Sequence, residues 1–211
     1  MMNVEVVVPE AMGCCGSATQ HMGKVDDANA RARRNIDAWI AEMEALIDKY
    51  PQDVEAKLFL ANSLSTPAGS YLPDGRPREG KIYGQMILKN LLVTHPNHAA
   101  VHHYWIHAVE NSSRPEEALP SCEKLVELAP NSGHMLHMPG HIYYRLGMYE
   151  KARAAFLRSL EFDLKYMREQ KIHPINNWNF VHNLDYLVAN SAEEGRYKEA
   201  GKYAKMLSEV P

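Results

Sequence analysis

Apolar residues recur at the spacing of an amphipathic helix along most of this chain. In residues 26–50 they lie three or four positions apart, so they share one helical face and predict a single long helix. That face carries Ile36, Trp39, Ile40, Met43, Leu46 and Ile47. Three apolar runs, EALIDKYP, KNLLVTHP and EKLVELAP, end at Pro51, Pro96 and Pro130. Because proline cannot continue a helix, each run predicts a helix that finishes just before it.

These prolines fall at a repeated interval. Pro96 and Pro130 are 34 residues apart, whereas Pro51 and Pro96 are 45 apart. The longer interval is one unit plus an insertion, and residues 65–80, rich in Gly and Pro, are predicted to form the loop that holds it. A Gly-x-Tyr-x-x-Ala pattern at 147–152 and again at 195–200 predicts two helix-to-helix turns.

A 34-residue period of helical hairpins resembles the tetratricopeptide-repeat family over roughly residues 50–209. The resemblance implies an all-α fold, a right-handed solenoid of hairpins that spans residues 26–211 and leaves residues 1–25 as an unplaced N-terminal segment. In each hairpin a first helix, A, is followed by a second helix, B. The A helices are predicted at 53–65, 98–111, 134–146 and 178–192, and the B helices at 78–94, 115–128, 149–165 and 196–209.

Two histidine-rich motifs narrow the resemblance. HYWIHAVE at 103–110 and GHMLHMPGHIYYRLG at 133–147 are similar to the HYxxHAxE and GHxxHMPxHIYxRxG motifs of a bacterial subgroup of the family. In the family, helix A lines the concave groove. The resemblance therefore implies that the polar residues of three successive A helices meet there: His103, His107, Glu110, His134, His137, His141, Tyr144, Arg145, His182 and Asp185. His102 is predicted to pack between helices instead.

The histidine spacing favours metal binding. His103 and His107 are four residues apart, as are His137 and His141, so each pair shares a helical face. Imidazoles with a carboxylate suit Zn, Fe, Cu or Mn, and the set is large enough for one ion or two. The predicted ligands are His103, His107, His134, His137, His141, His182 and Asp185. Glu110 is predicted to act as a ligand or general base, and Tyr144 and Arg145 as catalytic groups that steer an anionic substrate.

The sequence Pro139-Gly140 lies inside the third A helix and leaves two interpretations open. Proline removes a backbone hydrogen bond from a helix interior, so the helix is either kinked or begins only at Pro139, with His134 and His137 on the preceding loop. Alternatively, Gly140 lets two helices approach closely. A broken local rule within a histidine cluster is typical of a functional site.

Composition removes several classes of function. The formal charge is −3 and the pI about 6.4, which argues against a nucleic-acid-binding face. No apolar run is long enough to span a membrane, and the first residues do not resemble a signal peptide, so a cytoplasmic location is expected. The odd total of three cysteines predicts no disulfide framework, although Cys14-Cys15 could form a soft-metal or redox site.

Two functional hypotheses follow from the sequence. The first is a metal-dependent enzyme, an oxidoreductase or a hydrolase, that binds a small molecule or peptide in the groove. The second is a scaffold that binds a partner's peptide there without catalysis. A homodimer is compatible with both.

Overall fold

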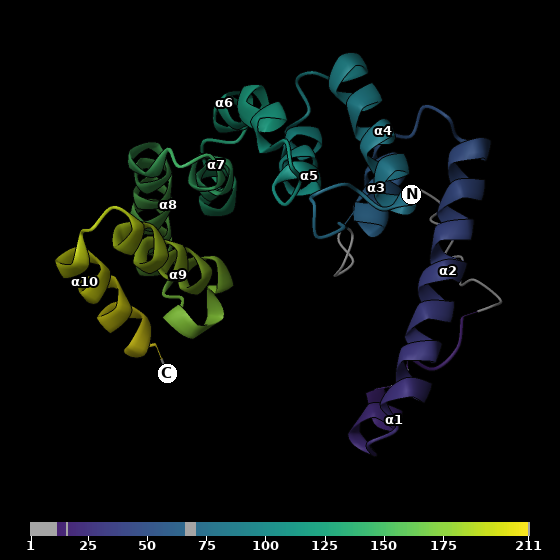
Figure 1. The fold of residues 1–211 in the computed structure, drawn as a ribbon, viewed down its shortest axis with the longest axis horizontal. Coiled ribbons are helices and arrows are strands. Elements are labelled where there is room, and N and C mark those ends of the chain that lie inside the picture. The colour runs from purple at the N-terminus through teal and green to yellow at the C-terminus, as the bar shows by residue number, and fades with distance from the viewer. Residues whose placement is uncertain (1–11, 16, 66–70, 211) are drawn as a thin grey trace.

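The computed structural model describes residues 12–15, 17–65 and 71–210. Within these ranges every regular element is a helix, apart from one isolated β-bridge between Tyr71 and Pro77. The helices follow one another along an arc, with α2 near one end and α10 at the other (Figure 1). Helices α5, α7 and α9 lie toward the inner side of the arc, and α4, α6 and α10 toward the outer side. The all-α solenoid predicted from the sequence is therefore confirmed.

The hairpins agree closely with the predicted helices. A short α1 (Ser17–His21) and the long α2 (Val25–Lys49) precede the first hairpin. The hairpins are α3 (Val54–Ser65) with α4 (Glu79–Thr94), α5 (Ala99–Val109) with α6 (Leu119–Leu128), α7 (Gly133–Arg145) with α8 (Tyr149–Gln170), and α9 (Trp178–Glu193) with α10 (Tyr197–Ser208). Two 3₁₀ turns, η1 (Pro115–Ala118) and η2 (Pro174–Asn176), precede α6 and α9.

The core is continuous along the array. One apolar cluster joins α3 to α7 through residues such as Leu91, Ile106 and Leu125, and a second joins α7 to α10 around Phe156 and Leu184. Tyr143 of α7 packs against both clusters. Each hairpin therefore buries its apolar face against its neighbours, as expected for stacked repeats.

The two predicted turns are present after α7 and α9. Gly147 has φ +70° and Gly195 has φ +72°, in the left-handed region that side chains with a Cβ rarely adopt. These glycines end their helices and allow the chain to reverse into α8 and α10. The sequence pattern has glycine at both positions because the turn needs a positive φ there.

Helix α7 is continuous through Pro139, so the alternative in which the helix begins at Pro139 is wrong. The helix starts at Gly133, where the Ser132 hydroxyl accepts a hydrogen bond from the Met135 backbone N–H. The other interpretation holds at Gly140, since a Cβ added there would lie 2.1 Å from Cε1 of the fully buried Phe156. Close packing of α7 on α8 therefore requires glycine, and His134 and His137 are helical.

Three segments differ from the predicted elements or include residues that the structure does not describe. Helix α8 runs to Gln170, beyond the predicted end at 165, because good helix formers continue and Met167 is buried. It ends at Lys171, whose φ is +54°. In the predicted 65–80 loop, residues 66–70 lie outside the described residues, as do residues 1–11 and 16 of the N-terminal segment. Helix α1 was not predicted. No helix in the described part of the chain has the length and apolar character needed to cross a membrane.

Candidate metal centre

Helices α5, α7 and α9 bring six histidines together on the inner side of the arc. We call His103, His107 and His134 the first triad, and His137, His141 and His182 the second triad. Within each triad, every histidine offers one ring nitrogen, and these nitrogens all lie within 4.8 Å of one another. The two i, i+4 pairs come from α5 and α7, and α9 contributes His182. All six histidines predicted as ligands thus lie in one of two adjacent groups.

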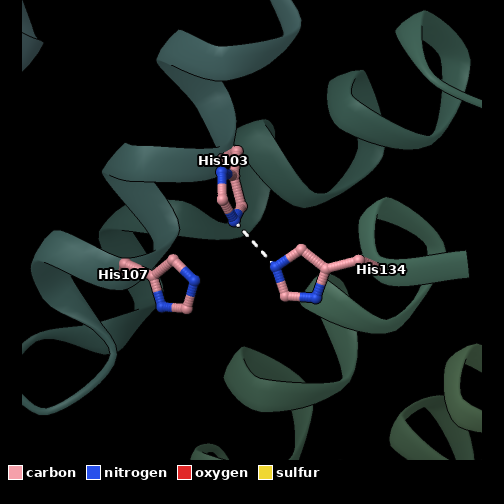
Figure 2. A group of neighbouring side chains, drawn as sticks. All are labelled: His103, His107 and His134. Carbon is pink, nitrogen blue, oxygen red and sulfur yellow. Dashed lines mark hydrogen bonds between the residues drawn. The ribbon is translucent and has the colours of Figure 1, made fainter. Parts of the chain in front are cut away.

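The first triad connects α5 and α7 (Figure 2). His103 Nε2 lies 3.0 Å from His134 Nε2, and the His103 and His107 ring centroids are 4.8 Å apart. The three rings converge on a common space between the two helices. All three side chains are half-buried, so this group remains partly accessible to solvent.

The second triad is more buried. His137 is fully buried and His141 is 7% exposed, with their Nε2 atoms 2.8 Å apart. The His182 ring centroid lies 4.9 Å from that of His137 and 5.8 Å from that of His141. Tyr186 covers the group, with its ring centroid 4.5 Å from that of His141. An aromatic wall therefore encloses this triad on the α9 side.

Two asparagines of α9 fix the outer nitrogens of two histidines. Asn179 Oδ1 lies 3.2 Å from His134 Nδ1, and Asn183 Oδ1 lies 2.7 Å from His137 Nδ1. Hydrogen bonds from the amide nitrogens fix the orientation of both asparagines. Asn183 Nδ2 donates to the Phe156 carbonyl at 2.8 Å. Asn179 Nδ2 donates to Asp163 Oδ2 at 2.6 Å. Each amide oxygen consequently faces its histidine.

Glu110 lies between the triads and contacts both. Its Oε1 is 3.2 Å from His107 Nδ1 in the first triad, and its Oε2 is 3.0 Å from His141 Nδ1 in the second. Among the described residues, Oε2 is buried without a hydrogen bond of good geometry, so the His141 contact is a close approach rather than an aligned hydrogen bond. Burial alone would raise the pKa of Glu110, but the His107 and His141 contacts hold it well below its usual range.

These contacts determine which ring nitrogen carries the hydrogen. An Nδ1 that faces a carboxylate or amide oxygen bears the N–H, because two acceptors would repel each other. A neutral imidazole has one N–H, so Nε2 of His107, His134 and His137 carries a lone pair in the neutral ring. In the second triad the Nε2 atoms of His137 and His141 lie 2.8 Å apart. This spacing suits a hydrogen bond between the two rings or a cation that both nitrogens would hold.

Burial favours the neutral form of four of the six imidazoles. Burial is the largest cause and the neighbouring histidines contribute, and together they lower the pKa of His103 to about 3, of His134 to about 4 and of His137 to about 2. Burial also lowers the pKa of His182. Neutral imidazole is the form that binds a metal ion, so these four rings have no proton to release on binding one at neutral pH.

The remaining predicted site residues belong to neither triad. Asp185 is exposed and does not belong to either group of potential ligands among the described residues. Arg145 Nε donates to the Glu110 carbonyl at 3.0 Å. Arg145 and Tyr144 line a small cavity that His141 also lines. His102 is buried and its ring nitrogens lie near Ser121 Oγ and the Pro96 carbonyl, so its predicted packing role is confirmed.

Four residues of α9 contact the triads but were not singled out from the sequence: Trp178, Asn179, Asn183 and Tyr186. One signal was available. Asn179 and Asn183 have the same i, i+4 spacing as the histidine pairs, and both neighbour His182 on a predicted A helix. Asparagine is common on helices for other reasons, however, and only the packing of α9 on α7 shows what these amides contact.

Sequence comparison identifies two family models in the chain. A tetratricopeptide-repeat model matches residues 134–166, which include most of α7 and the first part of α8. A model described as a cysteine-rich domain matches residues 1–51. In the described part of that range Cys14 and Cys15 are exposed, and neither joins a group of potential metal ligands. No curated protein matches the sequence significantly.

Several solved structures share the fold. A crystal structure of MamA is 17% identical with a TM-score of 0.62, and the match covers 87% of this chain and 92% of MamA. MamA from Desulfovibrio magneticus RS-1 is 15% identical with a TM-score of 0.61, covering 95% of this chain and 97% of that one. TTC0263, a TPR protein of Thermus thermophilus, is 17% identical with a TM-score of 0.57, covering 90% of this chain and 88% of that one. At these identities the likeness concerns the fold.

Proposed function

We propose that this chain, which is a tetratricopeptide-repeat protein by its fold and its matched repeat, binds a transition-metal ion at each of the two histidine triads. One observation carries the proposal. Four of the six histidines turn Nδ1 toward a fixed oxygen, which leaves Nε2 as the free ligand atom. Oxygen acceptors behind histidine ligands are the usual way in which proteins orient metal-binding imidazoles.

The donor set indicates which ions fit. Imidazole-only groups suit Zn, Cu or Fe, whereas Mn prefers oxygen ligands. Ligation at about 2.0–2.1 Å in a tetrahedral site separates nitrogens by about 3.4 Å, so atoms within 4.8 Å of one another need only small side-chain rotations. Zn, Fe or Cu is therefore the proposed occupant at both triads.

Three protein ligands favour chemistry over a structural role. Structural zinc sites are closed by four protein ligands, whereas catalytic sites keep one position for water or substrate. A metal ion with an open position activates water or polarises a substrate carbonyl. We propose that the protein is a metal-dependent enzyme on this basis, with Glu110 as the group that orients His107 and His141 rather than as a direct ligand.

Titration of tag-free protein with Co²⁺ tests the proposal. We expect two equivalents to bind, seen as visible absorption bands and by metal analysis of the purified protein. His103→Ala and His137→Ala are each expected to remove one equivalent, because each destroys one triad. His173→Ala is the matched control, since His173 is exposed and belongs to neither triad. Uptake below about 0.2 equivalents would overturn the proposal and favour a partner-binding groove without metal.

A further inference from the structure

A small cavity opens beside the second triad, between the end of α5 and the inner faces of α7 and α9. Its volume is about 130 Å³, and its walls are formed by Glu110, Asn111, His141, Tyr144, Arg145 and Tyr186. His141 belongs to the second triad, so a molecule in this cavity lies against a proposed metal ligand. The cavity is too small for a peptide segment and suits a ligand of a few heavy atoms.

Arg145 is held in place at the rim of this cavity. Its Nε donates to the Glu110 backbone carbonyl at 3.0 Å, which anchors the guanidinium at one edge. In the described part of the chain, no carboxylate lies within ion-pair distance of Arg145. The two terminal nitrogens of the guanidinium consequently remain available, and their planar arrangement matches the two oxygens of a carboxylate.

Another residue that lines the cavity has the opposite charge. Glu110 is half-buried, and its contacts with His107 and His141 hold its pKa well below its usual range, so it repels the negative end of any ligand. Tyr186 supplies a neutral wall, because burial and the nearby Glu110 charge raise its pKa to about 12. The charge pattern thus orients an anion with its negative group at Arg145 and its uncharged part toward His141.

We propose that this cavity is the substrate subsite of the second triad and accepts a small monocarboxylate, whose carboxylate pairs with Arg145 while its uncharged part faces His141. The inference rests on the proposed metal function and names the substrate class for that site. A monocarboxylate fits better than a phosphate, because Glu110 lines the same small cavity and its negative charge repels a more highly charged anion more strongly.

The test uses Co²⁺-loaded protein, with the cobalt spectrum as the readout. Propanoate is titrated against its uncharged isostere propanamide and against inorganic phosphate. Propanoate is expected to shift the visible bands, and propanamide to do so at least about ten-fold more weakly, because a charge-assisted hydrogen bond contributes about 1.5–3 kcal/mol. Phosphate that binds more tightly than propanoate would overturn the assignment to carboxylates.

Variants separate this inference from the proposed function. Arg145→Met is expected to keep two equivalents of Co²⁺ and to weaken propanoate binding at least about ten-fold. Arg34→Met, at an exposed position on α2, is the matched control and is expected to change neither value. If two equivalents of Co²⁺ bind but propanoate affinity is equal in wild type and Arg145→Met, the subsite is wrong and the metal function stands. If no Co²⁺ binds, both fail.

Discussion

The centre depends, residue by residue, on which ring nitrogen each histidine turns inward. His134 and His137 are fixed by Asn179 and Asn183, whose amide oxygens face Nδ1. The carboxylate of Glu110 does the same for two histidines at once, one in each triad. A single half-buried carboxylate therefore links the two triads, and its loss would affect both.

Asn183→Ala is expected to lower the metal affinity of the second triad by about 10–100-fold, the usual effect of removing the group behind a ligand histidine. The reason is that the His137 ring would lose its fixed orientation and tautomer. Competition with a chromophoric chelator measures the change.

Asn190→Ala is the matched control, because Asn190 is also buried on α9 but donates to the Tyr149 carbonyl and contacts no triad histidine. It is expected to cost stability without lowering metal affinity. Equal affinity in wild type and Asn183→Ala would contradict the role assigned to the amide.

The histidines could be predicted from the sequence, but the residues that orient their rings could not. The i, i+4 spacing within α5 and within α7 places each pair on one face whatever the tertiary structure. Asn183 is different. Its i, i+4 spacing from Asn179 places the two on one helical face, but only the packing of α9 on α7 shows that its amide contacts His137. Asp185 shows the converse. Its sequence position suggested a ligand, but its side chain is exposed to solvent.

Helix α7 is the element on which both triads depend, since it carries His134, His137 and His141. Its Pro139 removes one backbone hydrogen bond, and its Gly140 allows α8 to approach. The close approach brings Phe156 against the His137 ring, with centroids 4.9 Å apart. The sequence predicted that Pro139-Gly140 is unusual for a helix interior. It did not predict that the helix continues, because this depends on how α7 packs against other helices.

Gly140→Ala is expected to lower the free energy of unfolding by about 1–3 kcal/mol, because the added methyl group overlaps the fully buried Phe156 ring. Urea denaturation monitored by circular dichroism measures it. Gly201→Ala in α10 is the control, since no atom lies within 4 Å of its added Cβ. It should instead stabilise the protein by up to about 1 kcal/mol through helix propensity. Stabilisation by both substitutions would contradict the close approach of α7 and α8.

The molecule is an array of helical hairpins, and the regular spacing of these hairpins brings the histidine-bearing helices side by side. A repeat of 34 residues between Pro96 and Pro130 places α5 and α7 at equivalent positions on the inner side of the arc (Figure 1). Histidines that are far apart in sequence therefore lie close together. This period and the turn glycines made the hairpins predictable. The division of six histidines into two triads was not, because it depends on the distances between helices rather than on their order.

Anomalous diffraction from crystals of the Co²⁺- or Zn²⁺-loaded protein, recorded at the metal absorption edge, would locate the bound ions. We predict two anomalous peaks, one within about 2.0–2.1 Å of Nε2 atoms of the first triad and one at the same distance from those of the second. A single peak away from both triads, or no peak at any of the six histidines, would contradict the account.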